Sequence, residues 1–232
     1  MTLTWFQIFR LGFVQMALGA IVVLTTSTLN RLMVVELSLP AILPGLLVGL
    51  HYGIQLTRPH WGFYSDTGGH RTRWIIGGML ALALGAFMAA CALPIFPQSF
   101  AMGLAVSIVA YTLIGLGVGA SGTSLLALLA TATAPHRRAA AATITWLMMI
   151  FGIAATAGTV GQFIDPYSPT LLIKIVGIVV SIATLVTCIA VWRIERTLIA
   201  IREPDPTPFR EGLKGVWSER KARNFTIFVF LS

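Results

Sequence analysis

The chain has 232 residues, of which 56% are hydrophobic and only 10% are charged. A soluble domain carries roughly a quarter charged residues, so this composition excludes a soluble globular protein. The net charge is +8 and the isoelectric point is about 10.3. In so apolar a chain, loops that flank a membrane explain the excess of Lys and Arg better than nucleic-acid binding does.

Six apolar segments are long enough to cross the hydrocarbon core of a bilayer, which takes roughly 20 helical residues. Clusters of Pro and polar residues separate them, such as "SLPAILPG", "LPIFPQS" and "DPYSP". We therefore predict an all-α membrane protein with six spans, at about residues 6–29, 41–60, 74–95, 100–132, 139–163 and 170–192.

The distribution of basic residues predicts the orientation of these spans. One side of the membrane carries Arg10, Arg58, Arg71, Arg73, Arg137, Arg138 and the basic residues of 193–223. The other side has only Arg31, with Lys174 just inside the sixth span. Because Lys and Arg collect in cytoplasmic loops, the N-terminus is predicted to be cytoplasmic.

The sequence after the sixth span divides into two parts. Residues 194–223 form a basic linker, in which Phe209, Leu213, Val216 and Trp217 have helical spacing. This helix either lies on the inner leaflet or is a solvated connector. Residues 224–232, "NFTIFVFLS", begin a seventh apolar run that is too short to span. We therefore expect residues 1–193 to be the first, six-helix half of a longer protein.

The loop between the second and third spans, "GFYSDTGGHRTR", resembles a signature of the major facilitator superfamily. Gly62, Asp66, Gly69 and Arg71 match its pattern, and Arg73 adds a further base. The resemblance implies a half made of two three-helix repeats. It also implies that these five residues form a conformational latch between the two halves. The alternative is a cytoplasmic anchor of basic residues with a fortuitous Asp.

A second resemblance covers the chain from its start and is strongest from Asn30 to Gly78. The run "NRLMVVELSLPAILPGLLVGLHYGIQLTRPHWGFYSD" is similar to the PucC and LhaA family of phototrophic bacteria. That branch of the facilitators is linked to bacteriochlorophyll delivery and to assembly of light-harvesting antenna complexes. The resemblance implies a photosynthetic inner membrane, antenna polypeptides or photocomplex subunits as partners, and bacteriochlorophyll as a bound group.

One ionisable residue, His51, lies in the middle of the second predicted span. Ionisable groups at membrane depth are functional candidates. A neutral imidazole is a suitable ligand for the magnesium of a bacteriochlorophyll, and Gln55, four residues on, is placed to bind its second nitrogen. His51 and Gln55 are therefore the pigment-binding candidates. The alternative is a His that only hydrogen-bonds a neighbouring helix.

Spans four and five lack the charged relay of proton-coupled facilitators. Tyr111 stands where many of them have Arg, and "FGIAATAGTVGQF" contains no Gly-Pro. Small residues at helix-packing spacing in spans three and four predict close helix contacts; the alternative is that the same faces accept a flat macrocycle. They are Gly77, Ala81 and Gly85 in span three and Gly115, Gly119, Ser121 and Gly122 in span four.

The sequence shows no nucleophile with a base, no metal-ligand cluster and no phosphate-binding loop, so we expect no enzyme. The first hypothesis is a non-enzymatic factor that carries bacteriochlorophyll or holds antenna helices during assembly. One alternative is a secondary transporter of a small solute by alternating access. Another is a permanent structural subunit beside a reaction centre and its antenna.

Overall fold

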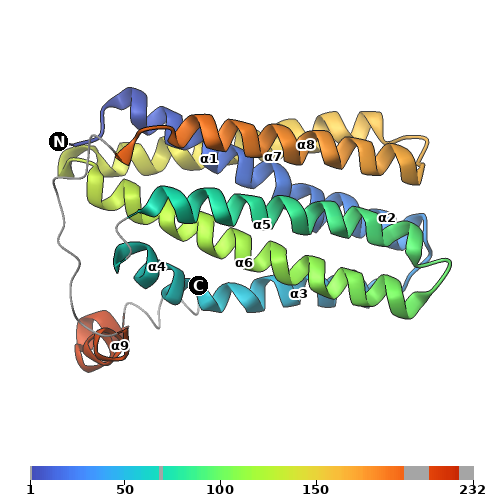
Figure 1. Cartoon of the computed structure of the whole chain (residues 1–232), viewed down its shortest axis with the longest axis horizontal. Helices are drawn as coiled ribbons and strands as arrows, with labels where there is room; N and C mark the ends of the chain where they lie inside the picture. Colours follow the sequence, from blue (N-terminus) through green and yellow to red (C-terminus); the bar gives the residue numbers. More distant parts are fainter. Residues whose placement is uncertain (1, 68–69, 196–208, 225–232) are drawn as a thin grey trace.

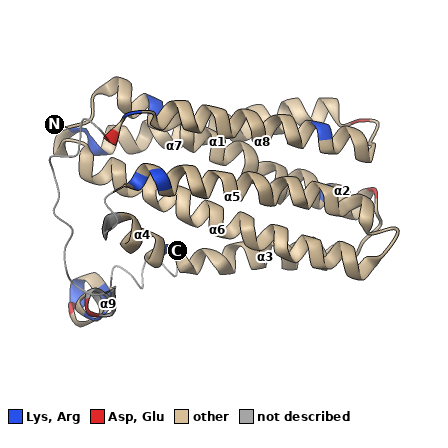
Figure 2. Cartoon of the chain, viewed as in Figure 1, with Lys and Arg blue, Asp and Glu red and all other residues tan. Residues whose placement is uncertain are grey.

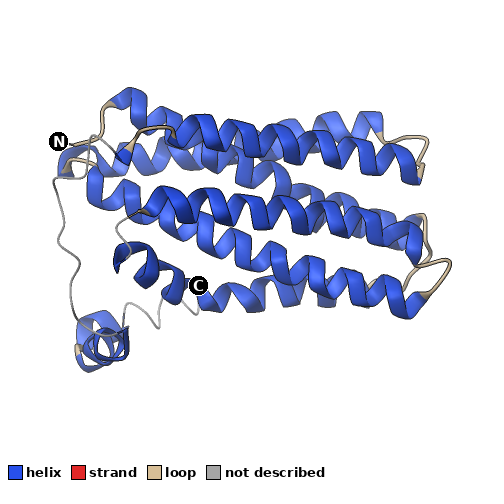
Figure 3. Cartoon of the chain, in the orientation of Figure 1, coloured by secondary structure: helices blue, strands red, loops and turns tan. Residues whose placement is uncertain are grey.

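A computed structural model describes residues 2–67, 70–195 and 209–224. These residues form helices joined by short loops, and no strand occurs among them (Figure 3). The all-α membrane fold is therefore confirmed. The helices run side by side, with their short connections at the two ends of the bundle (Figure 1).

Among the residues that the structure describes, five helices are long and apolar enough to span a membrane. The first contains α1 (Trp5–Val23), a π-helical turn (Leu24–Thr28) and α2 (Leu29–Val35). The others are α5 (Arg71–Ala92, extended by a 3-10 turn to Ile95), α6 (Phe100–Ala132), α7 (Arg138–Phe163, after the 3-10 turn Pro135–Arg137) and α8 (Pro169–Val191). Two shorter pieces, α3 (Ile42–Ile54) and α4 (Arg58–Thr67), follow the first span, and α9 (Phe209–Ser218) lies in the linker.

Polar side chains mark where several of these helices begin. Thr4 caps α1 in a capping box with Gln7, in which each side chain bonds the other residue's backbone N–H. Ser99 and Ser168 cap α6 and α8 by accepting from the N–H groups of Met102 and Leu171. These caps satisfy donors that would otherwise lack partners at the ends of the apolar spans.

The two three-helix repeats pack by equivalent contacts: the first helix of each repeat lies against the second helix of the other. The first helix of the first repeat, α1, packs against α7, the second helix of the second repeat. Correspondingly α6 packs against α3 and α4, which together occupy the second position of the first repeat. The third positions, α5 and α8, pack against α6 and α1 and against each other.

The contact between α5 and α6 is made by small residues, as expected, but not by all of those predicted. A methyl group at Gly78 would lie 2.8 Å from the carbonyl oxygen of Gly117, and one at Gly85 would lie 2.7 Å from that of Ala110. By contrast, a methyl at Gly77 would meet nothing within 4 Å. The prediction for Gly77 is wrong because adjacent residues of a helix lie about 100° apart, so only Gly78 faces α6.

Charged residues collect at the two ends of the bundle (Figure 2). At the end that holds the N-terminus, the Arg10 guanidinium donates to the carbonyl oxygens of Ile189 and Trp192 at 2.9 and 2.8 Å. Arg10 therefore ties α1 to the C-terminus of α8, where the helix dipole favours a cation. The Arg137 guanidinium lies 5.3 Å from the Trp5 ring at the same end.

Candidate functional site

The second predicted span, 41–60, is helical without a gap from Ile42 to Thr67, but it is not a uniform α-helix and is not one of the five membrane-span helices. It consists of α3, a 3-10 turn at Gln55–Thr57, and α4. Pro59 explains the break, because it has no N–H to donate to the Gln55 carbonyl oxygen four residues earlier. The Arg58 N–H binds that oxygen instead and tightens the turn. The Thr57 hydroxyl donates to the Ile54 carbonyl at 2.7 Å.

His51 lies in the last turn of α3, beside this break, rather than in the middle of a helix. The Arg58 guanidinium donates to Gln55 Oε1. The Gln55 amide nitrogen then lies 2.9 Å from His51 Nε2 and donates to it. This arrangement assigns the imidazole proton to Nδ1, because Nε2 is the acceptor. The structure thus brings His51 and Gln55 together as predicted.

The other ring nitrogen, His51 Nδ1, is buried and has no hydrogen-bond partner. A buried polar group without a partner is costly, so its presence calls for an explanation. In this tautomer Nδ1 carries the proton, so it can donate a hydrogen bond, and the magnesium of a pigment, which needs a lone pair, does not fit it. The ring is also closed to a macrocycle in this conformation, because the residue is only 1% exposed. The contact with α6 is close: a methyl group at Gly115 would lie 2.7 Å from the His51 carbonyl oxygen.

Three of the predicted latch residues are described: Gly62 lies on α4, and Arg71 and Arg73 lie on α5. The Arg71 guanidinium donates to the Thr131 hydroxyl and, at 3.1 Å, to the Ala127 carbonyl oxygen near the C-terminus of α6. Gly62 faces α6, where a methyl group would touch Thr123 at 3.5 Å. Arg73 is exposed. Gly69 and the Asp66 side chain lie outside the described residues, so the latch stays a prediction.

A second polar cluster was missed by the sequence reasoning. The Tyr111 hydroxyl, on α6, donates to the Thr25 carbonyl oxygen at 2.8 Å and lies 3.2 Å from Asn30 Oδ1. Thr25 belongs to the π-helical turn of the first span, and the Asn30 amide donates to the Thr26 carbonyl at 2.8 Å. Tyr111 is fully buried.

This cluster has a structural reason. In the π-helical turn the Leu29 N–H binds the Leu24 carbonyl oxygen, one residue earlier than the Thr25 oxygen that it would bind in an α-helix. An unsatisfied carbonyl in hydrocarbon costs several kcal/mol, and the Tyr111 hydroxyl supplies a donor. The signal in the sequence was Tyr111 itself, at the position where facilitators often have Arg.

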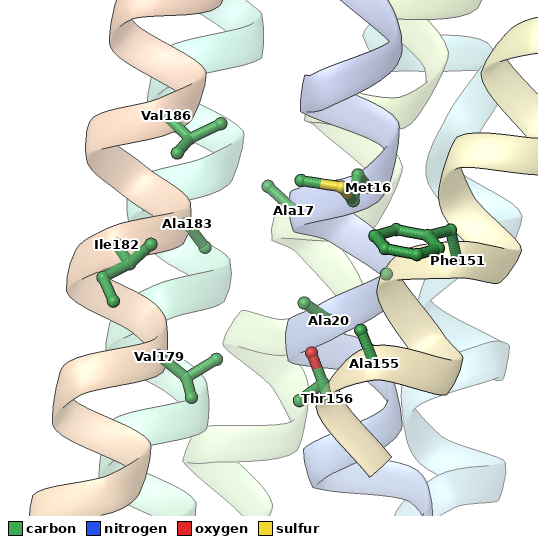
Figure 4. A pocket seen from close by; sticks show the side chains of 11 residues that line it. Met16, Ala17, Ala20, Phe151, Ala155, Thr156, Val179, Ile182, Ala183 and Val186 are labelled. Carbon is green, nitrogen blue, oxygen red and sulfur yellow. The ribbon is translucent and has the colours of Figure 1, made fainter. Parts of the chain in front are cut away.

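A cavity of about 220 Å³ lies between α1, α7 and α8 (Figure 4). Its lining is Met16, Ala17, Ala20, Phe151, Gly152, Ala155, Thr156, Val179, Ile182, Ala183 and Val186. Ligand pockets usually measure about 300–1,000 Å³, so the cavity is small for a pigment ring. Within the described ranges, no group of three His, Cys, Asp or Glu residues could hold a metal ion.

Comparison with known protein families shows to which family the chain belongs. The family model described as "PUCC protein" matches residues 28–232. The chain belongs to this family. The PUCC match includes the whole of the broken second span, with His51, Gln55 and the loop that resembles the facilitator signature.

Two relatives carry informative names. Over its whole length the chain is 64% identical to the "Bacteriochlorophyll synthase 44.5 kDa chain" of Rhodobacter capsulatus, and it covers 54% of that protein. It is 31% identical, over 82% of its length, to "Protein PucC" of Cereibacter sphaeroides and covers 44% of it. The chain thus spans about half the length of the curated relatives it matches.

A solved structure of the peptide transporter POT, in complex with alafosfalin, has the same fold. Its TM-score is 0.66 at 20% identity, over 96% of this chain and 46% of the transporter. At this identity the likeness shows the fold alone. Together with the PUCC match, it assigns the chain to the PucC branch of the major facilitator fold.

The name of the first relative corrects the expectation that the protein is not an enzyme. A protein 64% identical to this PUCC chain is named as a chain of a synthase, which points to an enzyme-associated protein. The sequence reasoning searched one chain for reacting groups. Such a search does not detect a chain that takes part in an enzyme through association with other chains.

Proposed function

We propose that the protein is an inner-membrane factor, associated with bacteriochlorophyll synthesis, that binds or delivers bacteriochlorophyll during assembly of light-harvesting antenna complexes. The names of its relatives support a photosynthesis-related membrane protein. The finer role, as an assembly factor that handles pigment, is our inference.

One observation carries this proposal: a buried imidazole nitrogen, His51 Nδ1, without a partner beside a broken span. The second ring nitrogen is held by Gln55, and Arg58 holds Gln55 in turn. Because the Gln55 amide donates to Nε2, the ring keeps its proton on Nδ1 and a fixed orientation. The ring is thereby set to donate one N–H to a ligand, such as a carbonyl oxygen of a bacteriochlorophyll.

Access to that nitrogen requires a movement, because His51 is buried. The break at Gln55–Thr57 provides a place where α3 can tilt independently of α4. Discontinuous helices line the binding sites of many transporters, where a small rearrangement opens or closes the site. In our proposal α3 separates from α6 at Gly115 when pigment binds.

The test is pigment co-purification with the His51→Leu variant. The full-length protein would be purified gently from a phototrophic membrane, and its near-infrared absorption compared with that of the variant. We expect a bacteriochlorophyll band with wild type and at least a tenfold loss in His51→Leu. The control is His60→Leu, which changes an exposed His on α4. An undiminished band in His51→Leu would exclude His51 as a pigment-binding residue.

The same preparation tests the proposed partners and location. We propose that the N-terminus faces the cytoplasm of the photosynthetic inner membrane, since the basic residues collect at that end (Figure 2). Mass spectrometry should find antenna polypeptides with the purified protein. Their absence, together with a colourless protein, would contradict the assembly role.

A solute transporter remains the second candidate, and the broken second span favours it. Uptake of solute into vesicles, driven by an ion gradient, distinguishes the two functions. A colourless protein that accumulates solute would support transport by alternating access. A pigmented protein without uptake would support the first proposal.

A further inference from the structure

The linker after the sixth span contains the helix α9, which stands apart from the bundle in Figure 1. Positions 209, 213, 216 and 217 are occupied by Phe, Leu, Val and Trp. At about 100° per residue these four positions fall within roughly 100° of one another on the helix. The backbone therefore gives α9 one apolar face, and Trp217 is 56% exposed.

The polar positions of this segment are mainly basic. Residues 209–224 contain Arg210, Lys214, Arg220, Lys221 and Arg223 against Glu211 and Glu219, which gives a net charge of +3. Lys214, Arg220 and Lys221 are exposed. Positions 210 and 214 flank the apolar face on the side of Trp217, whereas Glu211 lies farther round the helix.

The place of α9 in the molecule agrees with this pattern. Figure 2 shows α9 toward the end of the bundle that holds the N-terminus and most of the Lys and Arg residues. That end carries Arg10, Arg71, Arg73, Arg137, Arg138 and Arg193. Basic residues of this kind mark the cytoplasmic surface, whose leaflet contains anionic lipids.

We propose that α9 binds the anionic lipid headgroups of the inner leaflet, with its apolar face in the interface and its basic residues on the lipid phosphates. A helix with one apolar face, a Trp on it and basic residues beside it has the composition of an interfacial helix. The charge of the segment selects an anionic surface over a neutral one. The proposal is independent of pigment binding.

The experiment uses the full-length protein in nanodiscs made of phosphatidylcholine alone or of phosphatidylcholine with about 30% phosphatidylglycerol, an anionic lipid. Trypsin cleavage after Lys214 and Arg220 is followed by mass spectrometry. Cleavage after Arg137, in the 3-10 turn between α6 and α7, provides the reference rate for each lipid. We expect at least fivefold slower relative cleavage with phosphatidylglycerol, and we expect high salt to remove the difference because it screens the headgroup charge.

Three variants sharpen the test. Lys214→Glu and Trp217→Ser should lose the protection, because one reverses a charge at the edge of the apolar face and the other removes its aromatic anchor. Glu211→Gln is the matched control and should keep the protection, since position 211 lies away from that face. Cleavage remains possible at Arg220 in Lys214→Glu.

Equal relative cleavage in both lipids would overturn the proposal. So would protection that persists in detergent or in neutral lipid, because it would mean that α9 packs against protein, either another part of the full-length chain or a second copy. Protection that depends on phosphatidylglycerol, salt and Trp217 supports it.

Discussion

Two helices of this protein are interrupted within the membrane, and the two interruptions are resolved differently. In the first span the π-helical turn at Leu24–Thr28 is covered by Tyr111 and Asn30, whose polar groups bind the carbonyls of Thr25 and Thr26. In the second span the break at Gln55–Thr57 holds Arg58, Gln55 and His51 in a chain of hydrogen bonds that ends at an unpaired Nδ1.

The difference separates a structural contact from a candidate site. Where the polar groups satisfy one another, as around Tyr111, the cluster needs no ligand and joins α6 to the first span. Where a buried nitrogen is left without a partner, as at His51, the protein bears a cost that a bound ligand would remove. Three substitutions test whether this comparison is correct.

The largest loss of stability is expected from Gly115→Ala, because α6 packs tightly against α3 at this residue. The new methyl group would lie 2.7 Å from the His51 carbonyl oxygen and 3.0 Å from Ile54 Cβ, so α3 must move away from α6. Overpacking of this kind should lower the free energy of unfolding by about 2 kcal/mol. Thermal unfolding in detergent measures it.

The control for this substitution is Gly45→Ala, at a helical Gly of α3. A methyl group there would meet nothing within 4 Å. Its unfolding should match that of wild type. If both variants lose the same stability, the cost is common to Gly→Ala changes in these helices, and the packed contact at Gly115 has no special weight.

A smaller loss is expected from Tyr111→Phe. The substitution removes the hydroxyl and leaves the Thr25 carbonyl and Asn30 Oδ1 without their donor in a fully buried place. The expected loss is about 1.5 kcal/mol, again by thermal unfolding. Tyr64→Phe, at an exposed Tyr, is the control. An unchanged Tyr111→Phe would mean that the π-helical turn satisfies its own carbonyls.

The smallest effect on stability is expected from His51→Leu. The variant loses the bond to Gln55, but it also removes a buried N–H that has no partner. These terms oppose each other, so unfolding should stay within about 0.6 kcal/mol of wild type. A loss as large as that of Tyr111→Phe would show that His51 is a structural contact, and the comparison of the two interruptions would fail.

Much of the fold could be predicted from the sequence because the bilayer imposes simple length and composition rules. The fourth and fifth spans were predicted as 100–132 and 139–163, and α6 and α7 occupy Phe100–Ala132 and Arg138–Phe163. The second span was predicted as one helix despite Pro59. Periodic apolar character does not reveal whether a Pro kinks a helix or breaks it, since neighbouring helices decide that.

The candidate site was predictable only in part. His51 and Gln55 were paired by their spacing of four residues, which local helical geometry alone sets. The contact of Tyr111 with Thr25 joins residues 86 positions apart in sequence. Spacing along one helix carries no information about such a contact. The same limit applies to Gly77 and Gly78, where only the orientation of α5 against α6 chooses the packed residue.

By itself, the sequence determined that this is an all-helical membrane protein, where most of its spans begin and end, and which end carries the basic residues. Hydrocarbon length, Pro and capping residues, and the distribution of Arg and Lys act locally, so they can be read along the chain. Only the tertiary structure decided which small residues touch, which carbonyl Tyr111 binds, and that one nitrogen of His51 is left unpaired. Those properties depend on how helices pack across the bundle, where partners distant in sequence supply or deny each polar group its hydrogen bond.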